Sequence, residues 1–219
     1  MNAVESEQCT KARLLEAAIE LFAEKGFSGA ASRDICSRAG ANIAAVNYYF
    51  GSKEKLYAEA WRKAFHDSMA AHPRDGGVPR DAPPEERLRG RIRALIESVM
   101  DEKNMSFLIV HKEMSSPTAL LRSVTKECIN PLRVETLELV RELLGPRASE
   151  KQLRFCMASI MSQCLDVPIR YRIRRHHEGD GKPRWLADDV DGYIDHVTNF
   201  CIAGIRAVRQ RAPDSEKHE

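Results

Sequence analysis

Residues 32–56, SRDICSRAGANIAAVNYYFGSKEKL, contain the pattern that decides the fold of the N-terminal region. The helical spacing of apolar residues predicts one short helix over 32–39 and a second over 43–50. A tight turn at residues 40–42, which begins with Gly40, separates them. Two short helices joined in this way form a helix-turn-helix, whose second helix can enter the major groove of DNA.

A longer helix is expected before this motif, from about Lys11 to Lys25. Leu14 and Ala18 lie one turn apart on its apolar face. Thr10 is predicted to cap its N-terminus because a side-chain oxygen can accept a free backbone N–H, and Gly26 is predicted to end it. The three helices together predict an N-terminal DNA-binding unit.

Three polar residues of the motif are expected to begin helices because their side-chain oxygens can accept first-turn N–H groups. These residues are Ser32, Asn42 and Ser52. The helix that follows Ser52 is predicted to present Leu56 and Ala60 on one apolar stripe.

Helical periodicity continues through the rest of the chain, with no strand pattern and no internal repeat. Residues 72–84, HPRDGGVPRDAPP, predict a flexible loop, and Pro131 should bend the helix that contains it. Further helices are expected at about 85–103, 105–115, 118–144, 150–175 and 186–211. The sequence therefore predicts an all-α chain of about nine helices, with an N-terminal three-helix domain and a C-terminal helical bundle domain.

The charge of the chain is nearly balanced, with 34 Lys and Arg against 32 Asp and Glu among 219 residues. This balance excludes a highly basic polymer-binding arm but leaves room for a local basic face. Arginines at 87, 89, 91 and 93 are expected to include both solvated and pocket-rim positions. No apolar run approaches the length of a membrane span and no signal-peptide core is present, so a cytoplasmic chain without a membrane partner is expected.

The six cysteines, at 9, 36, 128, 156, 164 and 201, include no C-x-x-C pair. They are expected to be small buried apolar residues in a reducing compartment, with a thiol-based redox sensor as the alternative. His111 and Glu113 superficially match the H-x-E of zinc deaminases, but no P-C-x-x-C follows. No metal site and no cofactor are expected.

Several residues of the motif have the chemistry of DNA contacts. Ala44 and Ala45 are small enough to approach base edges, and Asn47 can hydrogen-bond an adenine edge. Arg33 can reach a guanine or a phosphate. The residues suited to phosphates are Tyr48, Tyr49 and Lys53. The competing interpretation is a generic helical hairpin with half-buried tyrosines.

The same segment resembles the N-terminal domain of TetR-family transcriptional regulators. The resemblance rests on Thr10, Ala18, Phe22, Gly26-Phe27, Asp34-Ile35, Ala39-Gly40, Tyr49-Phe50 and residues 52–56, SKEKL. The version ANIAAVNYYFGSKE, together with the later Pro131–Arg133 segment, is similar to the CecR-like branch. The strong resemblance covers about the first quarter of the chain.

The resemblance implies roles at matching positions. The implied base-facing residues are Arg33, Ile43, Ala44 and Asn47, and the implied phosphate contacts are Ser32, Ala45, Tyr48, Tyr49 and Lys53, with Asn42 beside them at the start of the recognition helix. The family often has Tyr at position 47, so its base preference does not transfer to Asn47.

The resemblance also implies a regulator that binds a double-stranded DNA operator, most simply a repressor released by a small-molecule effector. The expected organisation is a disordered tail at 1–8, a DNA-binding domain at 9–51, an effector-binding and dimerisation domain at 52–211 and a second tail at 212–219. Helices 150–175 and 186–211 are expected to form the homodimer interface. The candidate pocket residues are Met100, Phe107, His111, Met114, Met157 and Met161.

Two other functions fit parts of the pattern. A small helical enzyme could use His111 and Glu113 as acid and base, although the sequence offers it no nucleophile, metal set or cofactor loop. A helical interaction module could bind a protein partner through the long amphipathic helices. A DNA footprint, or removal of residues 1–50, separates these functions from DNA binding.

Overall fold

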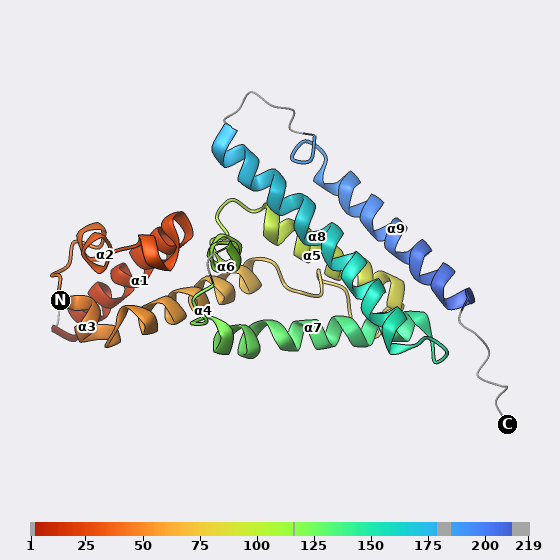
Figure 1. The fold of residues 1–219 in the computed structure, drawn as a ribbon, viewed down its shortest axis with the longest axis horizontal. Helices are drawn as coiled ribbons and strands as arrows, with labels where there is room; N and C mark the ends of the chain where they lie inside the picture. Colours follow the sequence, from red (N-terminus) through yellow and green to blue (C-terminus); the bar gives the residue numbers. More distant parts are fainter. Residues whose placement is uncertain (1–2, 116, 179–184, 212–219) are drawn as a thin grey trace. The chain divides into compact units, whose positions relative to one another are not determined.

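The computed structural model describes residues 3–115, 117–178 and 185–211, and these residues form helices and the turns between them (Figure 1). The helices are α1 (Ala3–Gly29), α2 (Ser32–Arg38), α3 (Ala45–Phe50), α4 (Lys53–Ala71), α5 (Pro84–Met100), α6 (Ser106–Ser115), α7 (Arg122–Leu144), α8 (Glu150–Glu178) and α9 (Val190–Arg211). The predicted all-α fold is confirmed. Within the same ranges, no helix is long and apolar enough to cross a membrane.

The chain divides into two compact units. The N-terminal unit takes in the described residues up to 70 together with those of 102–130. It therefore contains α1–α4, α6 and the first part of α7. The C-terminal unit contains α5, the rest of α7, α8 and α9. Pro131 lies inside α7, at the point where the chain passes from one unit to the other.

The core of the N-terminal unit is apolar and aromatic. Phe22 of α1 is fully buried and meets the ring of Tyr57 of α4 edge-on, with the ring centroids 4.7 Å apart. Trp61, one turn further along α4, and Ile109 of α6 belong to the same buried cluster. Burial of such large side chains, each contributing a few kcal/mol, is the main force that holds α1, α4 and α6 together.

The first helix begins earlier than the sequence indicated. It starts at Ala3, so residues 3–8, which were expected to form a disordered tail, are helical and Thr10 lies inside the helix. No glycine or proline interrupts this stretch, and the helical pattern therefore extends upstream. Gly26 does break the helical conformation, with φ 68°, and a last turn follows it to Gly29.

The expected caps have different outcomes. Ser32 is the first residue of α2, and Ala31 before it occupies the cap position without a side-chain hydrogen bond. Asn42 does not occupy the predicted cap position, which belongs to Ala44 and has no side-chain hydrogen bond; its side-chain oxygen instead accepts the N–H of Ala44 at 2.9 Å within the turn. Ser52 accepts the N–H of Lys55 at 3.2 Å and begins α4. The third helix begins two residues later than expected, at Ala45.

The C-terminal unit is organised around α5, which packs against α8 and α9. Its inward face buries Leu88, Ile92 and Ile96 among apolar residues of α7, α8 and α9. Three of the long helices thus share one apolar core with α5. This arrangement agrees with the amphipathic periodicity of the sequence.

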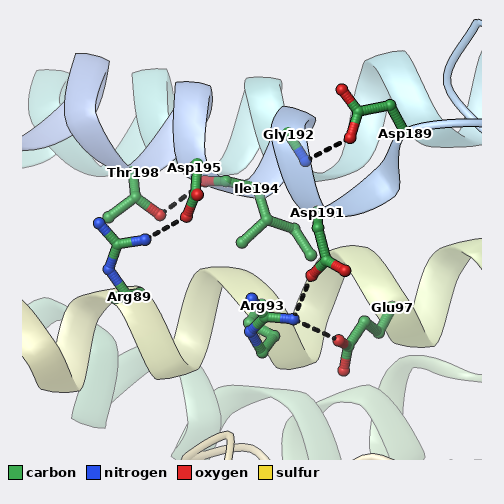
Figure 2. A network of polar contacts seen from close by, with 9 residues as sticks. All are labelled: Arg89, Arg93, Glu97, Asp189, Asp191, Gly192, Ile194, Asp195 and Thr198. Atoms are coloured by element: carbon green, nitrogen blue, oxygen red, sulfur yellow. Dashed lines mark hydrogen bonds and ion pairs between the residues drawn. The ribbon is translucent and has the colours of Figure 1, made fainter.

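Arginines on α5 reach two neighbouring helices in alternation. Arg87 and Arg91 donate to Glu142 and Glu135 of α7, at 2.5 and 3.1 Å. Arg89 and Arg93 bind Asp195 and Asp191 of α9 (Figure 2). We call these four residues the arginine ladder; all of them form ion pairs, so none is simply solvated as the sequence allowed.

The segment expected to be a flexible loop, 72–84, is held by specific contacts. Its last residue, Pro84, is the first residue of α5. Arg74 donates to Glu135 at 3.0 Å, and His72 lies 3.1 Å from Asp101. Gly76 has φ 63° and lies so close to the backbone of Gly90 that a Cβ there would collide with it.

The last described helix begins later than predicted, at Val190 rather than 186. Asp189 caps it, because its carboxylate accepts the N–H of Gly192 at 2.8 Å (Figure 2). The second expected tail, 212–219, lies outside the described residues.

Candidate nucleic-acid interface

The turn between α2 and α3 is flanked by a small set of buried apolar side chains. Ile35 and Cys36 of α2 and Val46 of α3 are buried. Gly40 takes φ 60°, a backbone conformation that suits glycine, and the next residue, Ala41, donates its N–H to the carbonyl of Cys36 at 2.9 Å. These contacts fix the angle at which α3 leaves the turn.

The opposite face of α3 and of the turn before it is exposed. Ile43 is 63% exposed and Tyr48 is 71% exposed, which is unusual for large apolar or aromatic side chains. Ala44, Asn47 and, at the start of α2, Arg33 are also exposed. The residues expected to face bases are therefore at the surface of one small structural unit.

Ala45 does not have the placement that a phosphate-contacting side chain needs. It is only 8% exposed and packs in the core of the N-terminal unit, while its N–H donates to the carbonyl of Asn42 at 2.9 Å. Its small size serves the close packing of α3 rather than the approach of DNA. Ser32 is half-buried.

Two tyrosines stand side by side at the end of α3. The rings of Tyr48 and Tyr49 meet edge-on, with their centroids 4.8 Å apart, and Tyr49 is half-buried. The hydroxyl of Tyr48 donates to the carboxylate of Glu7 at 3.2 Å. The charge of Glu7, reinforced by this hydrogen bond, raises the pKa of Tyr48, so the phenol keeps its proton. This contact was not predicted, because residues 1–8 were expected to form a disordered tail.

Lys53 lies at the start of α4 and is half-buried. Its Nζ sits over the ring of Phe27, 4.3 Å from the centroid, and burial lowers the pKa of the ammonium group. Neither Lys53 nor Arg33 forms an ion pair with any described residue. Both cations are thus available to an external anion.

Other cations of the N-terminal unit differ in availability. Arg38 is bound by Glu20 and Glu24 at 3.3 and 3.0 Å, which makes it part of the structure. Lys11 was not singled out from the sequence, but its Nζ lies 5.4 Å from the ring centroid of Phe50 at the end of α3.

Comparison with known protein families finds a match in each of two regions of the chain. Residues 14–60 match the family described as bacterial regulatory proteins, tetR family. Residues 84–205 match the C-terminal domain of the HTH-type transcriptional dual regulator CecR. The chain belongs to the TetR family of transcriptional regulators, in its CecR-like branch. This TetR-family chain is accordingly a DNA-binding transcriptional regulator.

Individual relatives agree with this assignment. The HTH-type transcriptional dual regulator CecR of Shigella flexneri is 30% identical over 172 residues, which cover 74% of this chain and 76% of that protein. The HTH-type transcriptional repressor KstR2 of Mycobacterium tuberculosis is 37% identical over 89 residues, 41% of this chain and 44% of that protein.

Solved structures share the fold at low identity. A transcriptional regulator from Pseudomonas aeruginosa has a TM-score of 0.65 and 19% identity, covering 92% of this chain and 91% of its own. A transcriptional regulator from Rhodococcus has a TM-score of 0.64 and 18% identity, covering 90% and 96%. At these identities the likeness concerns the fold.

The six residues expected to line an effector pocket are divided between the two units. Phe107 and His111 are half-buried on α6 of the N-terminal unit. Met157 is buried in the C-terminal unit, where Met100 and Met161 are half-buried. The side chain of Met114 lies outside the described residues. A surface pocket of about 370 Å³ between α5 and α9 is lined by Glu85, Arg89 and Arg206, among others, and by none of the six.

Five of the six cysteines are buried, as expected, and Cys9 is exposed. Burial raises the pKa of Cys164 to about 12 and that of Cys201 to about 11. A buried thiol with a raised pKa is a poor nucleophile, since the thiolate is the reactive form. The described residues contain no group of three or more His, Cys, Asp or Glu side chains placed to hold a metal ion.

Proposed function

We propose that this regulator represses transcription as a homodimer that binds a palindromic operator and is released from it by a small molecule. The observation that carries the proposal is the exposed surface of α3 and its preceding turn, where Ile43 and Tyr48 are largely solvent-accessible. Exposed large apolar side chains commonly mark a binding surface.

The proposed base contacts come from Arg33, Ile43, Ala44 and Asn47, which are all exposed. Asn47 would form a bidentate pair with an adenine edge, and Ile43 and Ala44 would pack against thymine methyl groups. The proposed phosphate contacts are Tyr48, Tyr49 and Lys53, with Ser32 and Asn42 contributing from the edges of the turn.

The proposed dimer interface uses the outer faces of α8 and α9. Phe155 of α8 is 60% exposed and Phe200 of α9 is 61% exposed, while the inner faces of both helices belong to the core of the C-terminal unit. A second copy of the chain would cover these rings in a four-helix arrangement. Two recognition helices would then read half-sites one helical turn apart, or a multiple of it.

The direction of regulation has two candidates. The relative from Shigella flexneri is described as a dual regulator, whereas the one from Mycobacterium tuberculosis is described as a repressor. Repression follows when an operator overlaps a promoter, and activation requires a contact with the transcription machinery. In vitro transcription from templates with the operator at different positions separates the two.

Release by an effector is proposed as a population shift. A small molecule that prefers a DNA-incompetent conformation of the regulator weakens operator binding by its differential affinity. A 100-fold release requires about 2.7 kcal/mol of coupling. The six candidate pocket residues named above remain the proposed starting points for mutation.

A catalytic role for His111 and Glu113 has less support. The carboxylate of Glu113 accepts hydrogen bonds from Tyr57 and Thr118, which are groups of the fold itself. A general base needs a free lone pair directed at its substrate. These bonds therefore disfavour Glu113 as the base of the enzyme alternative.

The experiment is selection of bound duplexes from a randomised DNA library with the purified protein at stated salt. A palindromic consensus supports the proposal and gives the half-site spacing. Lys53→Ala should then weaken selected and random duplexes alike and reduce the salt slope of binding by about one unit. Lys126→Ala, an exposed lysine of α7, is the matched control and should leave both unchanged.

Two outcomes contradict the proposal. Folded protein that enriches no sequence at any salt removes sequence-specific DNA binding. A monomer in light scattering at the concentration that saturates the operator removes the dimer, whereas a dimer that Phe200→Asp converts to monomer supports it.

A further inference from the structure

The N-terminal unit contains a chain of contacts that begins on α6 and ends at a proposed phosphate contact. Its first member, Glu113 of α6, is a half-buried carboxylate that the DNA interface does not use. It accepts the hydroxyl of Tyr57 at 3.1 Å and is therefore joined to α4, although 56 residues separate the two in sequence. A carboxylate placed in this way fixes the position of the ring that donates to it.

The ring of Tyr57 packs in turn against the ring of Phe27. The ring of Tyr57 is fully buried, and its centroid lies 5.2 Å from that of Phe27 and 4.7 Å from that of Phe22. Burial and the neighbouring charge of Glu113 raise the pKa of Tyr57 far above its ordinary value, so its hydroxyl remains a donor. The three rings form an aromatic corner between α1 and α4.

The aromatic corner supports Lys53 directly. The Nζ atom of Lys53 lies over Phe27, 4.3 Å from its centroid, one turn before Tyr57 on α4. Phe27 follows Gly26, where the backbone turns with φ 68° next to the side chain of Lys112 on α6. Two consecutive residues of α6, Lys112 and Glu113, therefore lie next to Gly26 and Tyr57 respectively.

The same carboxylate also holds the turn after α6. Thr118 donates its N–H and its hydroxyl to Glu113 at 2.9 and 2.8 Å. The next residue, Ala119, has φ 63°, a conformation that costs a residue with a side chain about 1 kcal/mol or more. Glu113 is thus shared between α4 and a strained turn that leads into α7.

From these contacts we propose that Glu113 is a positioning residue for DNA binding, which acts through Tyr57 and Phe27 to hold Lys53 at an operator phosphate. This inference rests on the proposed function of the α2–α3 surface. It also implies a route of regulation. A movement of the turn at 117–121 would change the hydrogen bonds of Thr118 to Glu113, and through Glu113 it would change the position of Tyr57.

The test uses Glu113→Gln and Tyr57→Phe, alone and combined with Lys53→Ala, on a fluorescent duplex taken from the library selection. Each single variant should weaken binding about fivefold, the effect of one lost hydrogen bond, and should lower the salt slope toward that of Lys53→Ala. In the Lys53→Ala background the same changes should alter affinity by less than about twofold, because their effect passes through Lys53.

Glu127→Gln is the matched control, since Glu127 also joins a neighbouring helix to α4, through Arg62 at 3.1 Å. It should leave affinity and salt slope unchanged. Stoichiometric titration and circular dichroism correct each value for the active, folded fraction. Tyr57→Phe keeps the buried ring and carries the test if Glu113→Gln does not fold.

Three results overturn the inference. In the first, the affinity losses of Glu113→Gln and Lys53→Ala multiply in the double variant. In the second, Glu113→Gln leaves the salt slope at the wild-type value. In the third, Glu127→Gln weakens binding as much as Glu113→Gln does. If Lys53→Ala weakens binding but Glu113→Gln and Tyr57→Phe do not, the positioning role fails while the proposed function stands. If no duplex is selected at all, both fail.

Discussion

Each of the two units is stabilised internally by a different kind of interaction. The N-terminal unit relies on a dense apolar and aromatic core and leaves Arg33 and Lys53 free of ion pairs with described residues. The C-terminal unit adds the arginine ladder of α5, which joins α7 on one side and α9 on the other. Both units contain cations paired with carboxylates, such as Arg38 in the first and the arginine ladder in the second, but Arg33 and Lys53 beside α3 form no ion pair with described residues.

The comparison shows why overall charge says little about this regulator. The net charge of +2 counts every Lys, Arg, Asp and Glu alike, including the arginines that are paired with carboxylates in the C-terminal unit. In the proposed function, DNA binding depends instead on cations such as Arg33 and Lys53, which form no ion pair with described residues. Four predictions test the contrast, starting with the largest effect.

Phe22→Ala should reduce the free energy of unfolding of the N-terminal unit by about 3–5 kcal/mol, because it empties the centre of the aromatic corner. Trp61 is buried in this unit, so denaturant unfolding followed by its fluorescence in a Trp185→Phe background reports on it alone. Ile43→Ala, at an exposed site, is the control and should change little. An equally small effect from both would contradict the role of the aromatic core.

Asn47→Ala should weaken binding to the selected operator by about 1–3 kcal/mol if the amide makes a bidentate base contact. Fluorescence anisotropy on operator and random duplexes measures the difference. Asn199→Ala, at an exposed asparagine of α9, is the control. Equal losses on both duplexes would assign Asn47 to the phosphates instead.

Ala119→Gly should stabilise the N-terminal unit by about 1 kcal/mol at most, because glycine adopts φ 63° without the clash of a side chain. Ala82→Gly, in the turn before α5, should instead lower stability by a few tenths of a kcal/mol, since it only adds freedom to the unfolded chain. Equilibrium unfolding in urea measures both. A loss of stability in Ala119→Gly would mean that the turn carries no strain.

The smallest effect is expected within the arginine ladder. The hydrogen bond to Asp191, and then that to Glu97, raises the pKa of Arg93, which stays charged at every working pH. A double-mutant cycle on Arg93 and Asp191 should give a coupling energy of about 0.5 kcal/mol that shrinks in high salt, because both groups are largely solvated. Arg170 and Asp166, an exposed pair within α8, provide the reference cycle. A coupling that does not change with salt would indicate a desolvated pair.

Much of the fold could be predicted from the sequence. Local rules of periodicity and capping account for the helices of the described residues, the turn at Gly40 and the cap at Ser52. Helix ends were less certain: α1 begins at Ala3 and α9 at Val190. Local propensity alone does not place an end, because a cap such as Asp189 competes with tertiary packing.

The candidate DNA surface was largely recognisable from residue types at helical spacing. Ala45 was the exception, because its burial depends on the packing of α3 against helices distant in sequence. The contact of Tyr48 with Glu7 spans 41 residues and could not be deduced from either side chain. The roles of Ser32, Asn42, Arg33, Asn47 and the pocket candidates remain predictions.

The sequence by itself determined the all-α class, the helix-turn-helix and the TetR family, because these depend on local spacing and on motifs within one stretch of chain. Only the tertiary structure decided which charges are free and which are used. The arginine ladder and the contact between Glu113 and Tyr57 join residues 44 to 106 positions apart. Such pairings arise when helices pack, and packing depends on the whole set of apolar faces rather than on any one segment.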